Sequence, residues 1–202
     1  MEITRINAYQ DSRFSRVALL QHGCFLADGA PYEVEITAPR EAVIRGPRPE
    51  FYPAVLEEFR FYAPEVCRFF SESGACVASF PEEPLLELPL EQIQPSQFYV
   101  DEEKLRAVGS FLHRPEDVIV QVLPYEGRYL ALDGHTRLLY AVRQGWGAVR
   151  ALIQPSDAYI FAFAQEAQRR GIRVPGDLIL LPHGTYREKW DGYCDAFFAG
   201  QA

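Results

Sequence analysis

The pattern of apolar and polar residues predicts a β-hairpin near the start of the chain. Apolar and polar side chains alternate over residues 32–37, and an apolar run at 24–26 precedes them. The two runs flank Asp28-Gly29, a pair that favours a tight hairpin turn. Further strands are expected at 16–20 and 42–45, and helical segments at 49–59 and 66–70. Residues 1–80 are therefore predicted to form an N-terminal α+β annex that contains a β-hairpin and a helix.

The most regular patterning lies between residues 85 and 155, where strand and helix periods follow each other closely. Three prolines and several acidic residues with little periodicity indicate a linker at 79–89. Strands are expected at 90–93, 118–122, 128–132 and 148–153, and helices at 102–108 and 138–143. Asp101 is placed to cap the first of these helices. The order strand, helix, hairpin, helix, strand is that of a compact α+β domain.

Two helices are predicted after residue 155, at about 156–170 and 182–198. Gly171 and Gly200 are placed to end them. Along the second helix, large side chains recur at three- and four-residue spacings, namely Trp190, Tyr193, Cys194, Phe197 and Phe198. Such a stripe is typical of a helix face that packs on its own domain. Residues 156–202 are accordingly predicted to form a C-terminal helical extension packed on the central domain.

Composition narrows the class of protein but leaves its activity open. The chain has 202 residues, of which 48% are hydrophobic and 24% charged, a balance typical of a folded globular protein. Its formal net charge of −8 argues against DNA as a partner, because proteins that neutralise many phosphates carry a basic face. No signal peptide and no apolar run of membrane-spanning length is visible, so a cytoplasmic protein without membrane contact is expected.

Metal-ligand spacing is not evident among the cysteines and histidines. The four cysteines are scattered, so reduced and packed thiols are expected rather than a disulfide framework or a zinc site. His22, His113 and His183 are expected to be ordinary surface or core residues. No metal site is therefore predicted.

One strand-to-helix junction, from Asp133 to Arg137, carries residue types suited to phosphate. Free backbone N–H groups and the helix dipole favour an anion at a helix start. Gly134 allows close approach of the backbone, Thr136 can donate a hydroxyl, and Arg137 can make paired hydrogen bonds to phosphate oxygens. His135 adds a donor or a proton shuttle. An alternative interpretation stays open, in which Asp133 caps the helix and Arg137 pairs with a nearby acid.

Three segments of the central domain carry a resemblance to known proteins. They are Leu88 to Gln97, Pro115 to Val120, and Tyr129 to Arg137 with Tyr140-Ala141 and Gly145 after it. Together with the helix expected at 102–108, they resemble the ParB/sulfiredoxin superfamily over residues 88–153. The resemblance implies an α+β fold whose centre is a ParB/sulfiredoxin-like domain. Members of the superfamily differ in the four residues that begin at Gly134.

Two branches of that superfamily do not fit. Sulfiredoxins carry Gly-Cys-His-Arg, with the cysteine as catalytic thiol, whereas this chain has His135 at that place, which excludes sulfinic-acid repair by that thiol. ParB-type CTPases carry Gly-Glu-Arg-Arg, of which only Gly134 and Arg137 are kept. A DNA-reading helix-turn-helix is not evident after the central domain. DNA partitioning is therefore not expected, and a ParB-like nucleic-acid-associated protein is the weaker alternative.

The nearest pattern is Asp-Gly-His-His-Arg, found in the free-serine-kinase-like branch. This chain has Asp-Gly-His-Thr-Arg, so Thr136 replaces the second histidine. Those kinases take as general base a glutamate two residues after a proline at the end of the first strand. Counted from Pro95, this chain has Gln97, which cannot accept a hydroxyl proton. The resemblance implies a kinase mechanism only if Asp133 or one of the pair Glu102-Glu103 substitutes.

The leading hypothesis from the sequence is binding of a nucleotide or small phosphorylated ligand, with ATP, ADP or CTP and Mg²⁺ as the cofactor choices. If the protein is an enzyme, phosphoryl transfer to a small hydroxyl compound is expected, with His135, Asp133 and Glu103 as catalytic residues. The expected phosphate- or nucleotide-binding residues are Ser96, Gln97, Gly134, His135, Thr136 and Arg137. The competing hypothesis is a non-catalytic regulatory or protein-interaction module that has lost the base at position 97.

Overall fold

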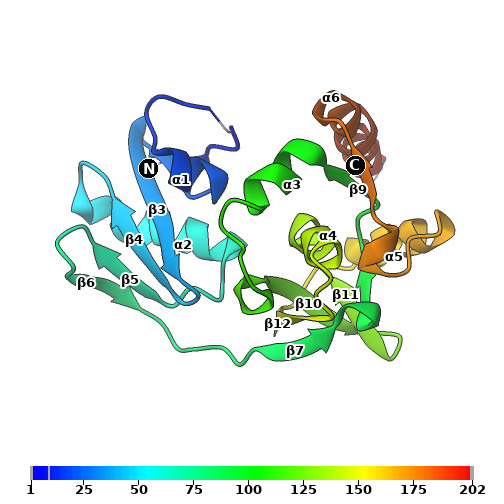
Figure 1. Cartoon of the computed structure of the whole chain (residues 1–202). Coiled ribbons are helices and arrows are strands. Elements are labelled where there is room, and N and C mark those ends of the chain that lie inside the picture. The colour runs from blue at the N-terminus through cyan, green and yellow to red at the C-terminus, as the bar shows by residue number, and fades with distance from the viewer. Residues whose placement is uncertain (1, 9, 201–202) are drawn as a thin grey trace. The chain divides into compact units, whose positions relative to one another are not determined.

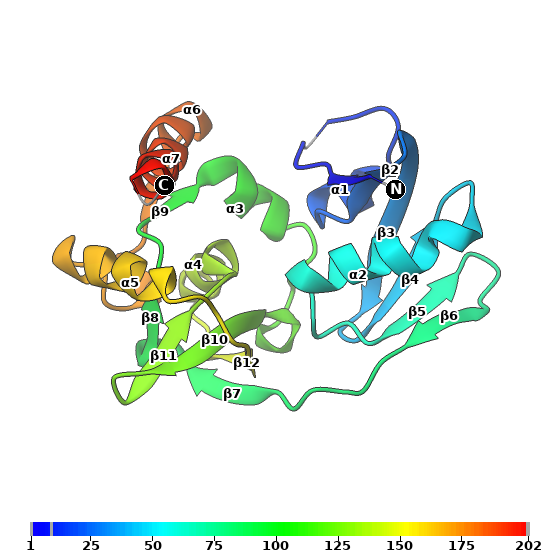
Figure 2. The same cartoon turned by 180° about the vertical axis from the view of Figure 1, so that it is seen from behind.

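The computed structural model describes residues 2–8 and 10–200. The chain has a mixed α+β structure and divides into two compact units, residues 1–83 and 84–202 (Figures 1 and 2). Each unit has its own sheet and its own buried core, and each is described by itself. Over the described residues, no helix is both long and apolar enough to cross a membrane.

The first unit is built on a six-stranded sheet whose strands lie in chain order from β1 to β6. β4 and β5 are parallel, and the other neighbours are antiparallel. Asp28 and Gly29 connect β2 to β3 and both have positive φ, 47° and 77°, as a tight hairpin turn requires. The predicted hairpin is therefore confirmed. The strands are β1 Ile3–Arg5, β2 Cys24–Ala27, β3 Ala30–Ala38, β4 Glu41–Arg45, β5 Arg68–Ser71 and β6 Cys76–Ser79.

Helix α2, Tyr52–Tyr62, covers one face of this sheet (Figure 1). The 3₁₀ turn Pro49–Phe51 leads into it, so the helix expected at 49–59 is confirmed. Phe59 lies at the centre of the core, and its ring makes edge-on contacts with Phe25 and Phe69 at centroid distances of 6.4 and 5.9 Å. All three of these rings are buried in the core of the unit.

Two segments of the first unit have a different secondary structure from the one predicted. Residues 16–20, expected as a strand, form helix α1, Arg16–Leu20, because the Ser15 side chain caps it by accepting a hydrogen bond from the N–H of Ala18. Residues 66–70, expected as helical, lead into β5, which pairs with β4 and buries Phe69 while Arg68 stays exposed. Apolar runs this short fit both the helix period and the strand period. Contacts with the rest of the folded unit then decide which of the two structures forms.

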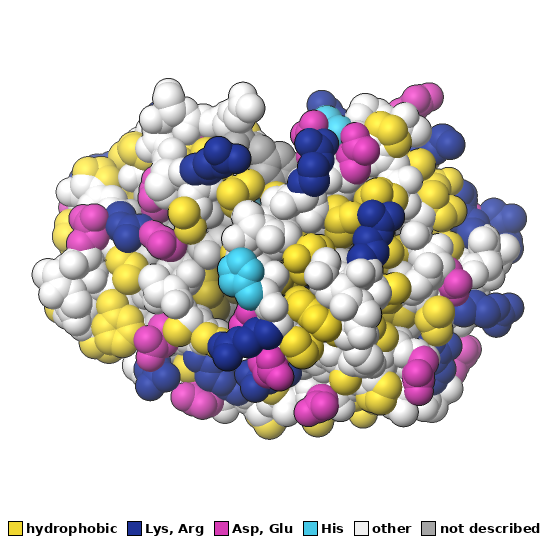
Figure 3. Space-filling view, viewed as in Figure 1, with side chains coloured by type: hydrophobic (Ala, Val, Ile, Leu, Met, Phe, Trp, Pro, Cys, Tyr) yellow, Lys and Arg dark blue, Asp and Glu magenta, His cyan; other side chains and the backbone are white. Residues whose placement is uncertain are grey.

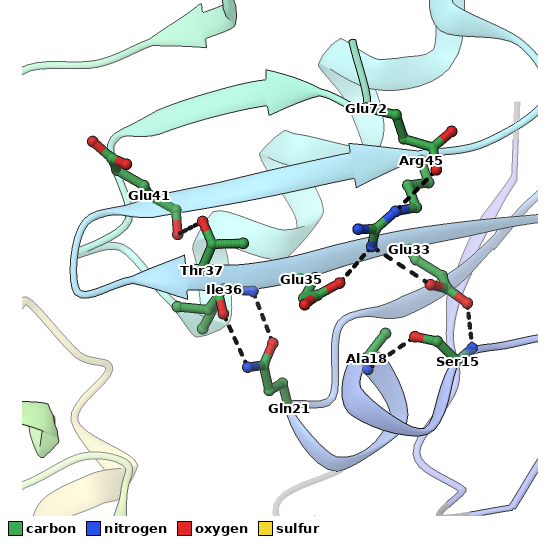
Figure 4. Close-up of polar contacts among 10 residues, drawn as sticks. All are labelled: Ser15, Ala18, Gln21, Glu33, Glu35, Ile36, Thr37, Glu41, Arg45 and Glu72. Atoms are coloured by element: carbon green, nitrogen blue, oxygen red, sulfur yellow. Dashed lines mark hydrogen bonds and ion pairs between the residues drawn. The ribbon is translucent and has the colours of Figure 1, made fainter. Parts of the chain in front are cut away.

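The outward face of β3 and β4 carries charged side chains around Arg45 (Figure 4). The Arg45 guanidinium lies 2.6 Å from Glu35, 3.2 Å from Glu72 and 3.9 Å from Glu33. These residues alternate along the strands with fully buried ones such as Val34. Partly exposed ion pairs of this kind add little stability each. Their effect is to keep this face of the sheet polar.

The second unit contains a five-stranded mixed sheet in the order β7-β12-β10-β11-β8. The strands predicted at 118–122, 128–132 and 148–153 are confirmed. The strand predicted at 90–93 begins only at Ile93, because Leu90–Gln92 form a 3₁₀ turn, and the linker predicted at 79–89 ends in a strand. The strands are β7 Leu86–Pro89, β8 Ile93–Pro95, β10 Ile119–Tyr125, β11 Arg128–Ala131 and β12 Ala148–Ile153.

Helices cover both faces of this sheet. On one face, Leu138 and Ala141 of helix α4, His135–Arg143, pack with the alternate residues Val120 and Val122 of β10. On the other face, helix α5, Tyr159–Arg169, packs Ile160 and Ala164 against β11. Helix α3, Glu102–Val108, lies beside α4 and begins at Asp101, whose carboxylate caps it as expected.

The segment after α5 pairs with a strand from the early part of the second unit. β13, Ile179–Leu181, pairs in parallel with β9, Tyr99–Asp101. The helix predicted at 182–198 is confirmed in extent, but it consists of α6 (His183–Tyr186), a π-helical turn (Arg187–Asp191) and α7 (Gly192–Ala199). Its aromatic side chains pack on the same unit, with Trp190 against Phe98 at a centroid distance of 4.9 Å.

Candidate functional site

Gly134 makes the turn from β11 into α4 and is the N-cap residue of that helix. Its φ is +86°, a left-handed conformation that favours glycine. A Cβ at this position would lie 2.7 Å from Cγ1 of Val120 and 3.2 Å from two nitrogens of Arg137. Glycine is therefore required both by the backbone conformation and by the close approach of two side chains.

Arg137 folds back over the start of α4. Its NH2 nitrogen donates to Oδ2 of Asp133 at 3.1 Å, and the two side chains are 21% and 59% exposed. The alternative interpretation from the sequence is thus half right. Arg137 does pair with an acid, but Asp133 does not cap the helix, because Gly134 is the cap residue and makes no side-chain cap hydrogen bond.

The start of α4 combines several features suited to an anion. No side chain caps it, and the first hydrogen bond of the helix runs from the N–H of Leu138 to the carbonyl of Gly134. The preceding N–H groups point out of the helix end, where the helix dipole adds positive potential. Thr136, which is partly exposed, and the Arg137 guanidinium lie on this first turn. Together they can bind the oxygens of a phosphate.

His135 is buried and joins α4 to the loop after β8. Its Nε2 atom accepts hydrogen bonds from the backbone N–H groups of Ser96 and Gln97, at 3.1 and 3.2 Å. The Ser96 hydroxyl lies 3.2 Å from the same nitrogen and donates to the carbonyl of Ala131 at 2.7 Å. Because Nε2 accepts from two N–H groups, the ring proton lies on Nδ1 and the imidazole is neutral.

Burial keeps His135 in that neutral form. Loss of hydration lowers the pKa of its imidazole to about 4, and the nearby positive charge of Arg137 acts in the same direction against the opposing effect of Asp133. The two hydrogen bonds to Nε2 of His135 hold Ser96 and Gln97 beside α4.

The Gln97 side chain contacts the C-terminal segment. Its Nε2 amide donates to the carbonyl of Tyr99 and to the hydroxyl of Tyr186, the latter at 3.3 Å. Burial raises the pKa of the Tyr186 phenol, which keeps it protonated. Gln97 thus contacts His135 through its backbone and α6 through its side chain.

Glu103, named from the sequence as a catalytic candidate, lies with a different group of residues. Its carboxylate is 3.9 Å from Nδ1 of His183, and the same nitrogen is 2.6 Å from Oδ2 of Asp101. Among the described residues, no hydrogen bond or ion pair joins Glu103 to the segment from Asp133 to Arg137. The sequence therefore missed a pairing of His183 with Asp101, since the two residues are 82 positions apart and no local pattern connects them.

Cavities and metal sites add two further observations. A hollow of about 270 Å³ lies over β7 and β12, and none of the candidate site residues lines it. It is lined by Glu87, Pro115, Glu116, Gly147, Ala148, Val149 and Arg150. In the part of the chain that the structure describes, no group of three histidine, cysteine or acidic side chains is arranged to hold a metal ion.

Comparison with known proteins gives distant likenesses to solved structures. No protein-family model matches the chain, and no curated protein matches it. Protein Atu1540 from Agrobacterium tumefaciens is 19% identical, with a TM-score of 0.31, over 48% of this chain and 53% of that one. Sulfiredoxin from Arabidopsis thaliana is 22% identical, with a TM-score of 0.30, over 45% of this chain and 99% of that one. This chain thus spans about half the length of Atu1540, and at these TM-scores neither likeness assigns a fold or a function.

Proposed function

We propose that the second unit binds a nucleotide or another small phosphorylated ligand at the start of α4. The observation that carries this proposal is the uncapped helix start at Gly134, with the Arg137 guanidinium folded over it and any Cβ excluded. Backbone N–H groups and a bidentate arginine are the donors that phosphate oxygens favour. The resemblance of residues 88–153 to the ParB/sulfiredoxin superfamily supports the same site.

Binding would exchange one carboxylate partner of Arg137 for a phosphate. Asp133 is the more exposed member of that pair, so its carboxylate can turn away when a phosphate arrives. In this proposal Asp133 would also give one oxygen to a Mg²⁺ ion that enters with a nucleotide, because Mg²⁺ commonly uses one or two carboxylates, the phosphates and water. ATP, ADP and CTP are the nucleotides to test first.

Thermal unfolding with added ligand tests the proposal directly. The panel is ATP, ADP, CTP and pyrophosphate at millimolar concentration, each with and without Mg²⁺. A ligand at 100 times its Kd stabilises the folded protein by about 2.7 kcal/mol, which raises Tm by several degrees. We expect such a shift for the wild-type protein and its loss in Arg137→Ala.

The matched control is Arg143→Ala, which removes an exposed arginine from the other end of the same helix. It should keep the full ligand-induced shift. If no ligand shifts the wild-type protein, or if Arg137→Ala responds as the wild type does, the start of α4 is not a phosphate site and the proposal fails.

A further inference from the structure

The hollow over β7 and β12 is lined by three segments that lie far apart in the sequence. Glu87 belongs to β7, Pro115 and Glu116 belong to the 3₁₀ turn before β10, and residues 147–150 lie around the start of β12. The volume of about 270 Å³ is below the range of about 300–1,000 Å³ for clefts that take drug-sized ligands. The hollow is therefore of a size for a small metabolite.

Main-chain hydrogen bonds hold these three segments together. β7 pairs with β12 so that Glu87 lies opposite Arg150. The N–H of Arg150 donates to the carbonyl of Val118, just after the 3₁₀ turn, at 3.0 Å. The turn is fixed by Asp117, whose Oδ2 atom accepts the backbone N–H of Arg114 at 3.2 Å. The lining is thus part of the folded backbone, as in most small-molecule sites, and is formed before any ligand arrives.

The charged side chains that line the hollow differ from many others on the surface. Acidic and basic groups lie next to one another over much of the face drawn in Figure 3. Glu87, Glu116 and Arg150, by contrast, make no salt bridge and no side-chain hydrogen bond among the described residues. The guanidinium of Arg114 lies near Glu116 but is already paired with Asp117 at 3.0 Å. The three charges of the lining are therefore available to a ligand.

The arrangement of these charges indicates the chemistry of that ligand. β12 lies between β7 and β10, and neighbouring strands are about 4.8 Å apart, so the strand of Glu87 and the strand that follows Glu116 are about 10 Å apart. Pro115 and Val149 add apolar surface to the lining. A matching ligand has two cationic groups joined by an aliphatic stem, together with one carboxylate for Arg150.

We propose that this hollow binds a free basic amino acid, arginine or lysine. Arg150 holds the α-carboxylate through paired hydrogen bonds, and the two glutamates of the lining each take one cationic group. The methylene groups of the ligand pack on Pro115 and Val149. At neutral pH such a ligand carries two positive charges and one negative, the reverse of the lining. The site shares no residue with the start of α4, so the proposal does not depend on phosphate binding there.

Calorimetric titration of the full chain tests the proposal. The ionic strength is set at about 0.15 M, where attraction between distant exposed charges is largely screened. L-arginine and L-lysine are the probes. Agmatine keeps both cationic groups of arginine but lacks the carboxylate, and L-citrulline keeps the carboxylate but lacks the guanidinium charge. We expect saturable binding of both probes and about tenfold weaker binding of agmatine, because the carboxylate makes charge-assisted hydrogen bonds to a half-buried guanidinium.

Substitutions of the charged lining residues should change this selectivity in opposite ways. Arg150→Met keeps a long apolar side chain but removes the guanidinium, so it should bind L-arginine and agmatine with the same Kd. Glu87→Gln and Glu116→Gln should each weaken L-arginine binding by about fivefold, as partly exposed ion pairs do, and reduce its preference over L-citrulline. The matched control is Glu91→Gln, which changes an exposed glutamate outside the hollow and should bind as the wild type does.

Gly147→Leu blocks the hollow and leaves every charge in place. Gly147 is exposed, and a Cβ at this position meets no atom within 4 Å, so the larger side chain enters open space. We expect it to weaken L-arginine binding and to leave Tm close to the wild-type value. Arg137→Ala, the variant that removes the guanidinium at α4, should bind L-arginine as the wild type does. The two proposed sites can therefore fail separately.

Three results would overturn the inference. The first is a wild-type protein that shows no saturable binding of either L-arginine or L-lysine. The second is an Arg150→Met variant that prefers L-arginine over agmatine as strongly as the wild type does. The third is tighter binding of a peptide that ends in arginine than of free L-arginine, which would assign the hollow to the terminus of a partner protein.

Discussion

Two histidines of the second unit show how the nitrogen that is engaged determines what a histidine can do. His135 is buried and uses Nε2 to accept two backbone N–H groups. His183 is half-exposed and uses Nδ1 to donate to a buried carboxylate. The first arrangement holds a loop in place and leaves the imidazole neutral. The second joins the start of α6 to β9 through a side chain that is 41% exposed. From the sequence, His135 is predicted as a catalytic residue and His183 as an ordinary surface or core residue.

The largest expected effect is on the free energy of unfolding, to which His135 should contribute more than His183. His135→Ala leaves the N–H groups of Ser96 and Gln97 without an acceptor inside the unit and creates a cavity. Each buried unsatisfied donor costs about 1–3 kcal/mol, so we expect a loss of about 4 kcal/mol in the free energy of unfolding, measured by urea denaturation. His135→Gln restores an oxygen near the place of Nε2 and should recover part of the loss. Equal losses in the two variants would contradict this role for Nε2.

Acid should destabilise the protein through His135. Its pKa is near 6.5 when unfolded and about 4 when folded, so the unfolded chain binds the proton first as the pH falls. The contribution is fully present above pH 6.5 and is lost progressively down to about pH 4, in total about 3 kcal/mol. Urea denaturation from pH 7.5 to 4 measures it. His135→Gln should show a shallower decline over the same range, and an identical decline would assign the acid sensitivity to other groups.

Replacing Gly134 should lower the free energy of unfolding more than replacing Gly145, although both glycines have positive φ. Gly134→Ala introduces a left-handed alanine and a 2.7 Å contact with Val120, and we expect a loss of about 2–3 kcal/mol together with loss of ligand binding. Gly145 also has positive φ, but a Cβ there meets no atom within 4 Å. Gly145→Ala should therefore cost only about 1 kcal/mol and keep ligand binding. The difference, from paired thermal melts, isolates the crowding at α4.

The smallest effect is expected at His183. Its side chain is 41% exposed, and His183→Asn preserves a donor for Asp101. The free energy of unfolding should change by less than about 1 kcal/mol, whereas His183→Ala leaves the buried carboxylate short of a donor and should cost more. If His183→Asn were as destabilising as His135→Ala, the pair would be chiefly a structural tie between β9 and α6.

Local patterns predicted those parts of the fold in which local chemistry and tertiary packing agree. The turn at Asp28-Gly29, the cap at Asp101 and the stripe on α7 each depend on neighbouring residues and were found from them. The segments at 16–20 and 66–70 were too short to show a clear helix or strand period. The Ser15 cap favours a helix in the first, and pairing with β4 makes the second part of a strand. β13 has only three residues and exists through its pairing with β9.

The candidate site also has features that adjacent residues predicted and features that depend on distant contacts. The residues from Asp133 to Arg137 are contiguous, so a group of residue types suited to phosphate could be recognised from the motif. The alternative interpretation predicted that Arg137 pairs with an acid, which the structure shows to be Asp133. The same interpretation named Asp133 as the cap residue, whereas the structure has Gly134 there. Burial of His135 and the pairing of His183 with Asp101 depend on distant parts of the chain, and no spacing in the sequence encodes them.

The parallel pairing of β13 with β9 also has a consequence for the order of events during synthesis. Asp101 leaves the ribosome long before His183, and contacts between distant segments form slowly because a long loop must close first. The sheet from β7 to β12 and the start of α4 can be complete while α6 is still being made. The pairing of His183 with Asp101 would then form as one of the last steps of folding.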